Sequence, residues 1–106
     1  MTLYPAIKVV IVTEKMIVKG VCDLIERSGA TGYTIMAAGG KGSHGVRTIS
    51  DRAAVIDDFS DVRIEVIMHD KEKAEAMMSN IAAAYFKDYA GITYLDVVEV
   101  LRPKKF

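Results

Sequence analysis

The segment AAGGKGSHGVRTIS, residues 37–50, combines the residue types that hold an anion. Four of the eight glycines of the chain fall between positions 39 and 45, and glycine lets the backbone adopt positive φ angles and expose successive N–H groups. Cationic and hydroxyl side chains add further donors: Lys41, Ser43, Arg47, Thr48 and Ser50. The segment matches neither GxxxxGK[ST] nor GxGxxG, so it indicates either a phosphate site or a plain connection between two strands.

Other residues that support metal binding or catalysis are sparse. His44 and His69 lie neither four residues apart on a helix nor beside a cysteine, so no metal site is expected. His69 is expected to be a polar residue at a strand end. Cys22 is the only cysteine, which excludes an internal disulfide, and it is expected to be a small buried side chain on a helix. No spacing indicates a nucleophile with its base, and we expect a protein that is not an enzyme.

The composition indicates one compact domain, residues 1–106, without affinity for nucleic acid. The chain is 51% hydrophobic and its 14 basic and 14 acidic side chains cancel, whereas nucleic-acid surfaces are normally basic. The apolar run Ile7–Val12 is too short to span a membrane and shows no leader-peptide pattern, so we expect a cytoplasmic protein without direct membrane insertion. A domain this small buries limited surface alone, which favours an oligomer.

The first half of the sequence predicts a strand, a helix and a second strand. Residues 6–12 are nearly all apolar and mostly β-branched, as in a strand buried on both faces. Thr13 is a candidate helix cap, and the helix expected over 14–29 stops at Gly29. The apolar face of this helix consists of Ile17, Val21, Leu24 and Ile25. Residues 32–38 form the second expected strand.

The second half predicts another strand, helix and strand. Residues 61–69 alternate apolar and polar side chains, with an apolar face of Val62, Ile64, Val66 and Met68. Asp70 is a candidate cap for a helix over 71–89, and the inner face of this helix consists of Ala74, Met77, Ile81 and Tyr85. Gly91 is expected to end that segment, and residues 92–103 supply the fourth strand. The six methionines are expected to pack in the core.

The order βαββαβ predicts an α+β fold, a ferredoxin-like sandwich with a four-stranded antiparallel sheet and two helices on one face. The connection between the second and third strands, residues 39–60, is about twenty residues long, whereas hairpin loops usually have two to five. Because long loops in compact domains usually carry function, we expect function there.

Three separated stretches, taken together, resemble the PII-like signalling proteins. They are VVIVTEK (9–15), SGATGYTIMAAGGKGSHGVR (28–47) and YFKDYAGITYLDVVEVL (85–101). The similarity is closest to the SbtB branch, which is linked to bicarbonate uptake, and to the carboxysome-associated PII-like proteins. It covers nearly the whole chain, from about residue 8 to residue 101.

The resemblance implies a homotrimer that binds an adenine nucleotide in clefts between neighbouring subunits. AMP, ADP and cyclic AMP are the implied regulatory ligands, with bicarbonate as a co-ligand and no cofactor. The T-loop, about residues 40–60, would change shape with the ligand and so regulate inorganic-carbon uptake or fixation. The implied protein partner is a bicarbonate transporter or a carboxysome-related protein.

The resemblance also assigns site residues. The base of the T-loop, near the phosphate, would consist of Gly40, Lys41, Gly42 and Ser43. Arg47 falls where family members place an arginine against the phosphate, and Thr34 and Met36 would face ribose and base. The loop that closes over the nucleotide from the neighbouring chain would consist of Tyr89, Ala90 and Gly91. The basic tail, with Arg102, Lys104 and Lys105, reaches a phosphate in one interpretation and stays solvated in the other.

This sequence departs from the family pattern at several positions. His44 stands where many SbtB-type proteins have an arginine, which predicts weaker or pH-dependent phosphate binding. Ile92 stands where nitrogen-sensing PII proteins have a lysine, so tight Mg-ATP binding and 2-oxoglutarate sensing are not expected. The sequence ends at LRPKKF, without the cysteine-containing extension of some SbtB proteins, so neither a redox switch nor hydrolysis tied to it is expected.

Two alternatives belong to other classes. The first is a CutA-type metal-tolerance protein, which shares the trimeric fold but would need clustered metal ligands. The second is a small enzyme such as a nucleotide hydrolase.

Overall fold

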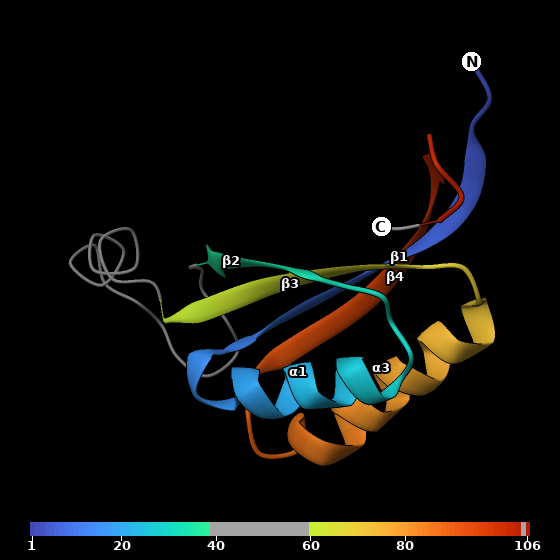
Figure 1. Cartoon of the computed structure of the whole chain (residues 1–106). Coiled ribbons are helices and arrows are strands. Elements are labelled where there is room, and N and C mark those ends of the chain that lie inside the picture. Colours follow the sequence, from blue (N-terminus) through green and yellow to red (C-terminus); the bar gives the residue numbers. More distant parts are fainter. Residues whose placement is uncertain (39–59, 105) are drawn as a thin grey trace.

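The computed structural model describes residues 1–38, 60–104 and 106. The elements in chain order are β1 (Tyr4–Glu14), the 3₁₀ helix η1 (Lys15–Ile17), α1 (Val18–Arg27), β2 (Thr34–Ala38), β3 (Asp61–Met68), α3 (Lys71–Tyr85) and β4 (Gly91–Val100). They form one antiparallel sheet with both helices on one face (Figure 1). The predicted ferredoxin-like sandwich is confirmed, whereas every expectation that falls on residues 39–59 lies outside the described residues.

The strand order across the sheet is β2-β3-β1-β4, so β1 lies inside the sheet and pairs with β3 and β4. This position explains its nearly continuous apolar sequence. Ile7, Val9 and Ile11 face the helices, while Val10 on the opposite face is also fully buried. The prediction of a strand buried on both faces is therefore confirmed for the centre of β1.

The hydrophobic core lies between the sheet and the helices. Alternate residues of β1 and β3 contribute one side, and residues three to four apart on the helices contribute the other. The helix residues are Ile17 of η1, Val21 and Ile25 of α1, and Ala74, Met77 and Ile81 of α3. The apolar faces predicted for both helices agree with this core.

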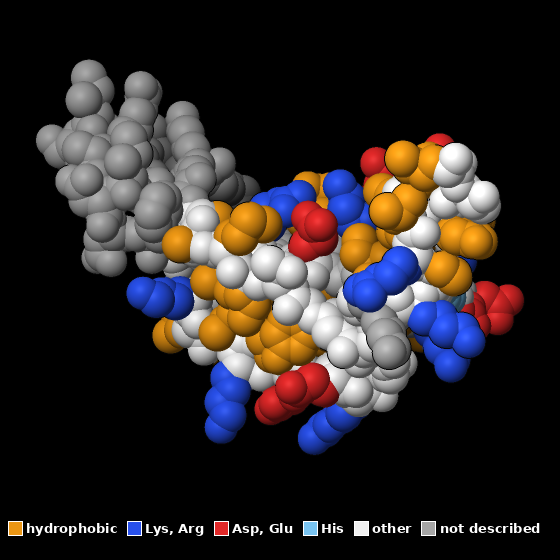
Figure 2. Space-filling view, turned by 45° about the horizontal axis from the view of Figure 1, so that its top comes forward, with side chains coloured by type: hydrophobic (Ala, Val, Ile, Leu, Met, Phe, Trp, Pro, Cys, Tyr) orange, Lys and Arg blue, Asp and Glu red, His pale blue; other side chains and the backbone are white. Residues whose placement is uncertain are grey.

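The sheet face that points away from the helices is called the open face here. Its side chains follow from the strand register: Thr34 and Met36 on β2, Arg63 and Glu65 on β3, Val10 and Val12 on β1, Ile92 and Tyr94 on β4. Apolar and charged side chains alternate over this side of the molecule (Figure 2). The open face is therefore chemically mixed, unlike the core.

The predicted start of the first helix is wrong in detail. Thr13 lies inside β1 and is buried, and its hydroxyl donates to the carbonyl of Ala90 at 3.5 Å rather than capping a helix. The 3₁₀ helix η1 leads into α1, and neither has a side-chain cap. The stop at Gly29 is confirmed by its φ of 88°, a conformation that favours glycine. The second strand begins at Thr34, two residues later than predicted.

The second helix begins as predicted but ends earlier. The Asp70 carboxylate accepts the N–H groups of Glu72 and Lys73 at 2.9 and 3.3 Å. The helix ends at Tyr85, and Gly91 is the first residue of β4 instead of the helix stop. A Cβ atom at Gly91 would overlap the ring of Phe86, so the absence of a side chain allows this close contact.

The expectation for the methionines holds only in part. Met68 and Met77 are buried and Met78 packs against the core. Met16 and Met36 are exposed, because η1 and the open face of β2 direct them away from the core.

Candidate functional site

The two site residues predicted on β2 lie on the open face beside a charged pair. Thr34 is opposite Glu65 on β3, and Met36 is opposite Arg63. The Arg63 guanidinium donates to Glu65 at 2.9 Å. Hydrogen bonds to Glu65 and then to Tyr94 of β4 raise the pKa of Arg63 above its ordinary value. The face next to Thr34 and Met36 therefore carries an ion pair on β3, and its guanidinium also interacts with Tyr94 of β4 across the intervening β1.

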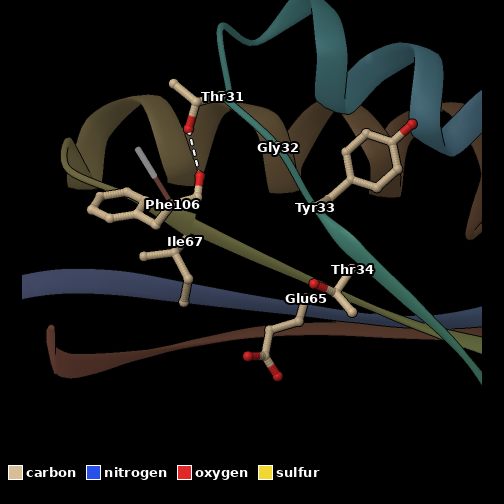
Figure 3. Close-up of a pocket in the computed structure, with 7 residues that line it drawn as sticks. All are labelled: Thr31, Gly32, Tyr33, Thr34, Glu65, Ile67 and Phe106. Atoms are coloured by element: carbon tan, nitrogen blue, oxygen red, sulfur yellow. Dashed lines mark hydrogen bonds between the residues drawn. The ribbon is translucent and has the colours of Figure 1, made fainter. Parts of the chain in front are cut away.

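A hollow of about 620 Å³ lies next to the start of β2 (Figure 3). It exists because β2 begins opposite Glu65 whereas β3 continues to Met68, so the last part of β3 has no β2 partner. The residues that line the hollow are Thr31, Gly32, Tyr33, Thr34, Glu65, Ile67 and Phe106. Hydroxyl and carboxylate groups thus surround an apolar patch, a lining that suits a small polar ligand with a flat ring.

The side chain of Tyr33 turns from the hollow toward α1. Its hydroxyl donates to Glu26 at 3.3 Å. A hydrogen bond with Cys22, followed by desolvation, raises the pKa of Tyr33 to about 12. Burial raises the pKa of the Cys22 thiol, although Cys22 is only half-buried rather than fully buried as predicted. These contacts attach the segment just before β2 to α1.

The predicted closing loop, Tyr89 to Gly91, is held by the end of β1. The carboxylate of Glu14 accepts the N–H of Ala90 at 2.7 Å, and the hydroxyl of Thr13 approaches the Ala90 carbonyl at 3.5 Å. Tyr89 packs against the core, with its ring 6.5 Å from that of Tyr85. Both backbone groups of Ala90 therefore have partners within the chain.

The strand register fixes where the entry to the predicted T-loop lies relative to the closing loop. Ala38 pairs with Asp61, Asp61 pairs with Glu14, and Gly91 pairs with Thr13. The entry to the predicted T-loop and the closing loop therefore lie at the same end of the sheet but on opposite edges. Three strand spacings separate the edges, which is about 14 Å. One chain alone does not bring its two predicted ligand-binding segments into contact.

The other predicted site residues lie either outside the described residues or at the opposite end of β4. Gly40, Lys41, Gly42, Ser43 and Arg47 are outside the described residues. Arg102 follows the opposite end of β4 from Gly91, about 30 Å along the strand. It cannot meet the closing loop of its own chain.

Two contacts near the site could not be predicted from any pattern in the sequence. Glu14 contacts Ala90 across 76 positions, and Thr31 contacts Phe106 across 75. Glu14 occurs in the VVIVTEK stretch, but nothing in that stretch indicates a partner near residue 90. These contacts depend on the sheet order and not on a local pattern.

Two features are absent from residues 1–38, 60–104 and 106. No group of three or more His, Cys, Asp or Glu side chains there is placed to hold a metal ion. None of the helices in those ranges is long and apolar enough to cross a membrane.

Comparison with known proteins identifies close similarity in sequence and fold. A PII-like signaling protein from Thermus thermophilus is 34% identical, with a TM-score of 0.72, and the match covers 94% of this chain and 93% of that one. CPII, a nitrogen regulatory PII-like protein from Thiomonas intermedia bound to ADP, AMP and bicarbonate, is 26% identical. Its TM-score is 0.76, and the match covers 97% of this chain and 100% of CPII.

A more distant neighbour, the GlnK–ATP complex of B. subtilis, is 14% identical with a TM-score of 0.53 over 87% of this chain and 82% of GlnK, which shows the fold alone. The resemblance to PII-like proteins drawn from the three sequence stretches is confirmed. The family model described as nitrogen regulatory protein P-II matches residues 6–105, almost the whole sequence, and this chain therefore belongs to the P-II family.

Proposed function

We propose that this protein is a non-enzymatic signalling protein that binds AMP, ADP or cyclic AMP in clefts between the subunits of a homotrimer. Bicarbonate acts as a co-ligand. The bound ligands change the T-loop, about residues 40–60, and so change its affinity for a bicarbonate transporter or a carboxysome-related protein. The protein thereby regulates inorganic-carbon uptake or fixation.

The position of the two sheet edges is the observation that carries the proposal. The T-loop entry at Ala38 and the closing loop at Gly91 share one end of the sheet but are about 14 Å apart. A ligand contacted by both segments is best placed between two copies of the chain, where the β2 edge of one copy meets the β4 edge of the next. The exposed apolar side chains of the open face, Met36, Ile92 and Tyr94, favour such an assembly.

The choice of ligands rests on similarity. CPII, which the chain matches over nearly its full length, is bound to ADP, AMP and bicarbonate. Cyclic AMP and the link to carbon uptake come from the resemblance to the SbtB branch.

Titration calorimetry with each nucleotide, with and without bicarbonate, tests the proposal directly. We expect saturable binding of at least one of AMP, ADP and cyclic AMP, and no release of phosphate from ATP. Sedimentation should give a trimer at micromolar concentration. A monomer, or no binding of any of the three nucleotides, would contradict the proposal.

Arg47 provides the sharpest variant, because an arginine that meets a phosphate makes charge-assisted hydrogen bonds. Arg47→Ala should weaken nucleotide binding by about 1.5–3 kcal/mol. Arg27→Ala is the matched control, since Arg27 is an exposed arginine in the last turn of α1. Equal affinities of the Arg47 variant and the wild type would show that Arg47 does not contact the ligand.

A further inference from the structure

The closing loop joins the sheet at Ala90, one residue before the strand pairing of β4 begins. The last pair between β1 and β4 joins Thr13 to Gly91, so both strands reach this end of the sheet (Figure 1). Beyond that pair, the side chains of Thr13 and Glu14 contact the backbone of Ala90. The end of β1 therefore continues to hold the loop where the ladder has stopped.

The contact with Glu14 is the stronger of the two. Its carboxylate accepts the Ala90 N–H at 2.7 Å, a distance typical of a charge-assisted hydrogen bond, and such bonds are stronger than those between neutral groups. The hydroxyl of Thr13 reaches the Ala90 carbonyl only at 3.5 Å, which is long for a hydrogen bond. The position of Ala90 thus depends mainly on Glu14.

The earlier part of the loop is held from the other side, by α3. The N–H groups of Asp88 and Tyr89 donate to the carbonyl of Tyr85 at 3.1 and 3.0 Å, and Tyr89 packs against the core. These contacts do not involve Glu14. Loss of Glu14 should therefore free the loop locally at Ala90 and leave the helix and the core in place.

The charge of Glu14 alone would be unfavourable near an anionic ligand. Glu14 lies opposite Asp61 in the ladder between β1 and β3, so two carboxylates stand at the end of the sheet from which the predicted T-loop departs. Negative charges repel a phosphate. Removal of Glu14 should therefore strengthen nucleotide binding if its charge dominates, and weaken binding if its hold on the closing loop dominates.

We propose that Glu14 is a positioning residue for nucleotide binding, which acts through the closing loop and not by contact with the ligand. Its carboxylate holds Ala90 so that the loop already has the conformation that meets the nucleotide. This inference rests on the proposed nucleotide binding and names the residue that prepares one of its two segments. A loop that is free before binding lowers the apparent affinity in proportion to the time it spends in other conformations.

Calorimetry on the intact protein tests this role, with whichever of AMP, ADP and cyclic AMP the wild type binds most tightly. Glu14→Ala should bind at least about fivefold more weakly, which corresponds to a loop in the competent conformation about a fifth of the time. Glu14→Gln keeps an acceptor oxygen for the Ala90 N–H without the charge and should recover most of the affinity. Thr13→Val removes only the longer contact and should weaken binding less than Glu14→Ala.

Two control variants separate positioning from general effects. Ile64→Val removes a methyl group from the buried core and lowers stability away from the loop. Glu99→Ala removes a carboxylate from an exposed site on β4. Both should bind the nucleotide like the wild type. Equal weakening by Ile64→Val and Glu14→Ala would overturn the proposal, because loss of stability would then explain the effect.

The glutamate variants themselves can also contradict the proposal. Unchanged or tighter binding by Glu14→Ala would mean that the carboxylate does not prepare the loop. Binding by Glu14→Gln as weak as that by Glu14→Ala would mean that the hydrogen bond to Ala90 is not what Glu14 contributes.

Hydrogen exchange of the closing-loop amides gives a readout that a purely structural role would not move. In the wild type, the Ala90 amide should exchange slowly with or without saturating nucleotide, because Glu14 already holds it. In Glu14→Ala it should exchange fast without nucleotide and slowly with it, since the ligand then orders the loop. Nucleotide that binds the variant without slowing this amide would overturn only the positioning role. Absence of binding by the wild type would overturn the proposed function as well.

Discussion

The two faces of the sheet are formed by alternate residues of the same strands, yet a single chain completes only one of them. On the helix side, Ile11, Ile64 and Val66 are fully buried against α1 and α3. On the open face, the side chains of Ile92 and Tyr94 are 57% and 44% exposed. The difference arises because both crossover helices pack on the same side of the sheet.

The two faces therefore differ in role, because one stabilises the fold and the other is suited to recognition. The helix face contains apolar side chains in a closed core, whose main effect is to hold the fold. The open face mixes exposed apolar side chains with the Arg63–Glu65 pair, a composition suited to contact with another surface. The proposed subunit clefts use this second face and the sheet edges next to it.

A matched pair of isoleucines tests the contrast between the faces most strongly. Ile64→Ala removes a fully buried side chain from the helix face and should lower the free energy of unfolding by about 2–5 kcal/mol. Ile92→Ala, on the open face, should lower the free energy of unfolding of the monomer by less than about 1 kcal/mol. Denaturant unfolding at several protein concentrations separates the monomer from the assembled protein. Equal losses in the monomer would mean that the two faces of a single chain do not differ as described.

The contact between Glu14 and Ala90 tests how firmly the closing loop is held at the end of the sheet. Glu14→Ala leaves the Ala90 N–H without its acceptor and should cost about 1.5–3 kcal/mol of folding free energy, as expected for hydrogen bonds to charged groups. Glu14→Gln retains an acceptor oxygen and should cost less. Hydrogen exchange of the Ala90 amide should accelerate in the alanine variant, while Glu99→Ala, at an exposed site on β4, serves as control. An unchanged exchange rate would mean that Glu14 does not hold the loop.

The third test concerns Tyr33, which joins the edge of the sheet to α1, and its effect appears only at high pH. The hydrogen bond with Cys22 and desolvation raise its pKa from 10.0 to about 12. Because the folded state holds this proton more tightly than the unfolded state, the stabilisation is complete below pH 10 and is lost as pH rises through about 12.

Ultraviolet titration of tyrosine ionisation measures this pKa. Tyr33→Phe should remove the component that ionises near pH 12, whereas Tyr4→Phe should leave it in place. A wild-type protein in which no tyrosine ionises above about pH 11 would contradict the contact with Cys22.

The sequence predicted most of the elements because their signals are local. Alternation in β3 and helical spacing in α3 each repeat within a few residues, and the Asp70 cap acts on N–H groups two and three residues away. The errors have a common cause. Thr13 has the residue type of a cap but continues β1, because its strand partners Val62 and Gly91 extend the sheet past it.

For the site, the sequence and its family resemblance assigned the T-loop, Thr34 and the closing loop, and the structure places Thr34 in the lining of the hollow. The resemblance also assigned Met36 to face the ligand, which agrees with its exposure on the open face, whereas the general expectation that the methionines pack in the core does not hold for it. The sequence did not predict that Phe106 would return to Thr31. Local patterns give no information about a partner 75 positions away.

The sequence by itself determined the order of strands and helices, the apolar faces of both helices and the family, since all of these depend on neighbouring residues or on continuous stretches that can be compared directly. Only the tertiary structure decided which distant groups meet. The order β2-β3-β1-β4 sets Ala38 and Gly91 on opposite edges, ties Ala90 to Glu14 and leaves β3 unpaired where Phe106 packs. Strand pairing fixes these distances through the constant spacing and register of the sheet, which no single segment encodes.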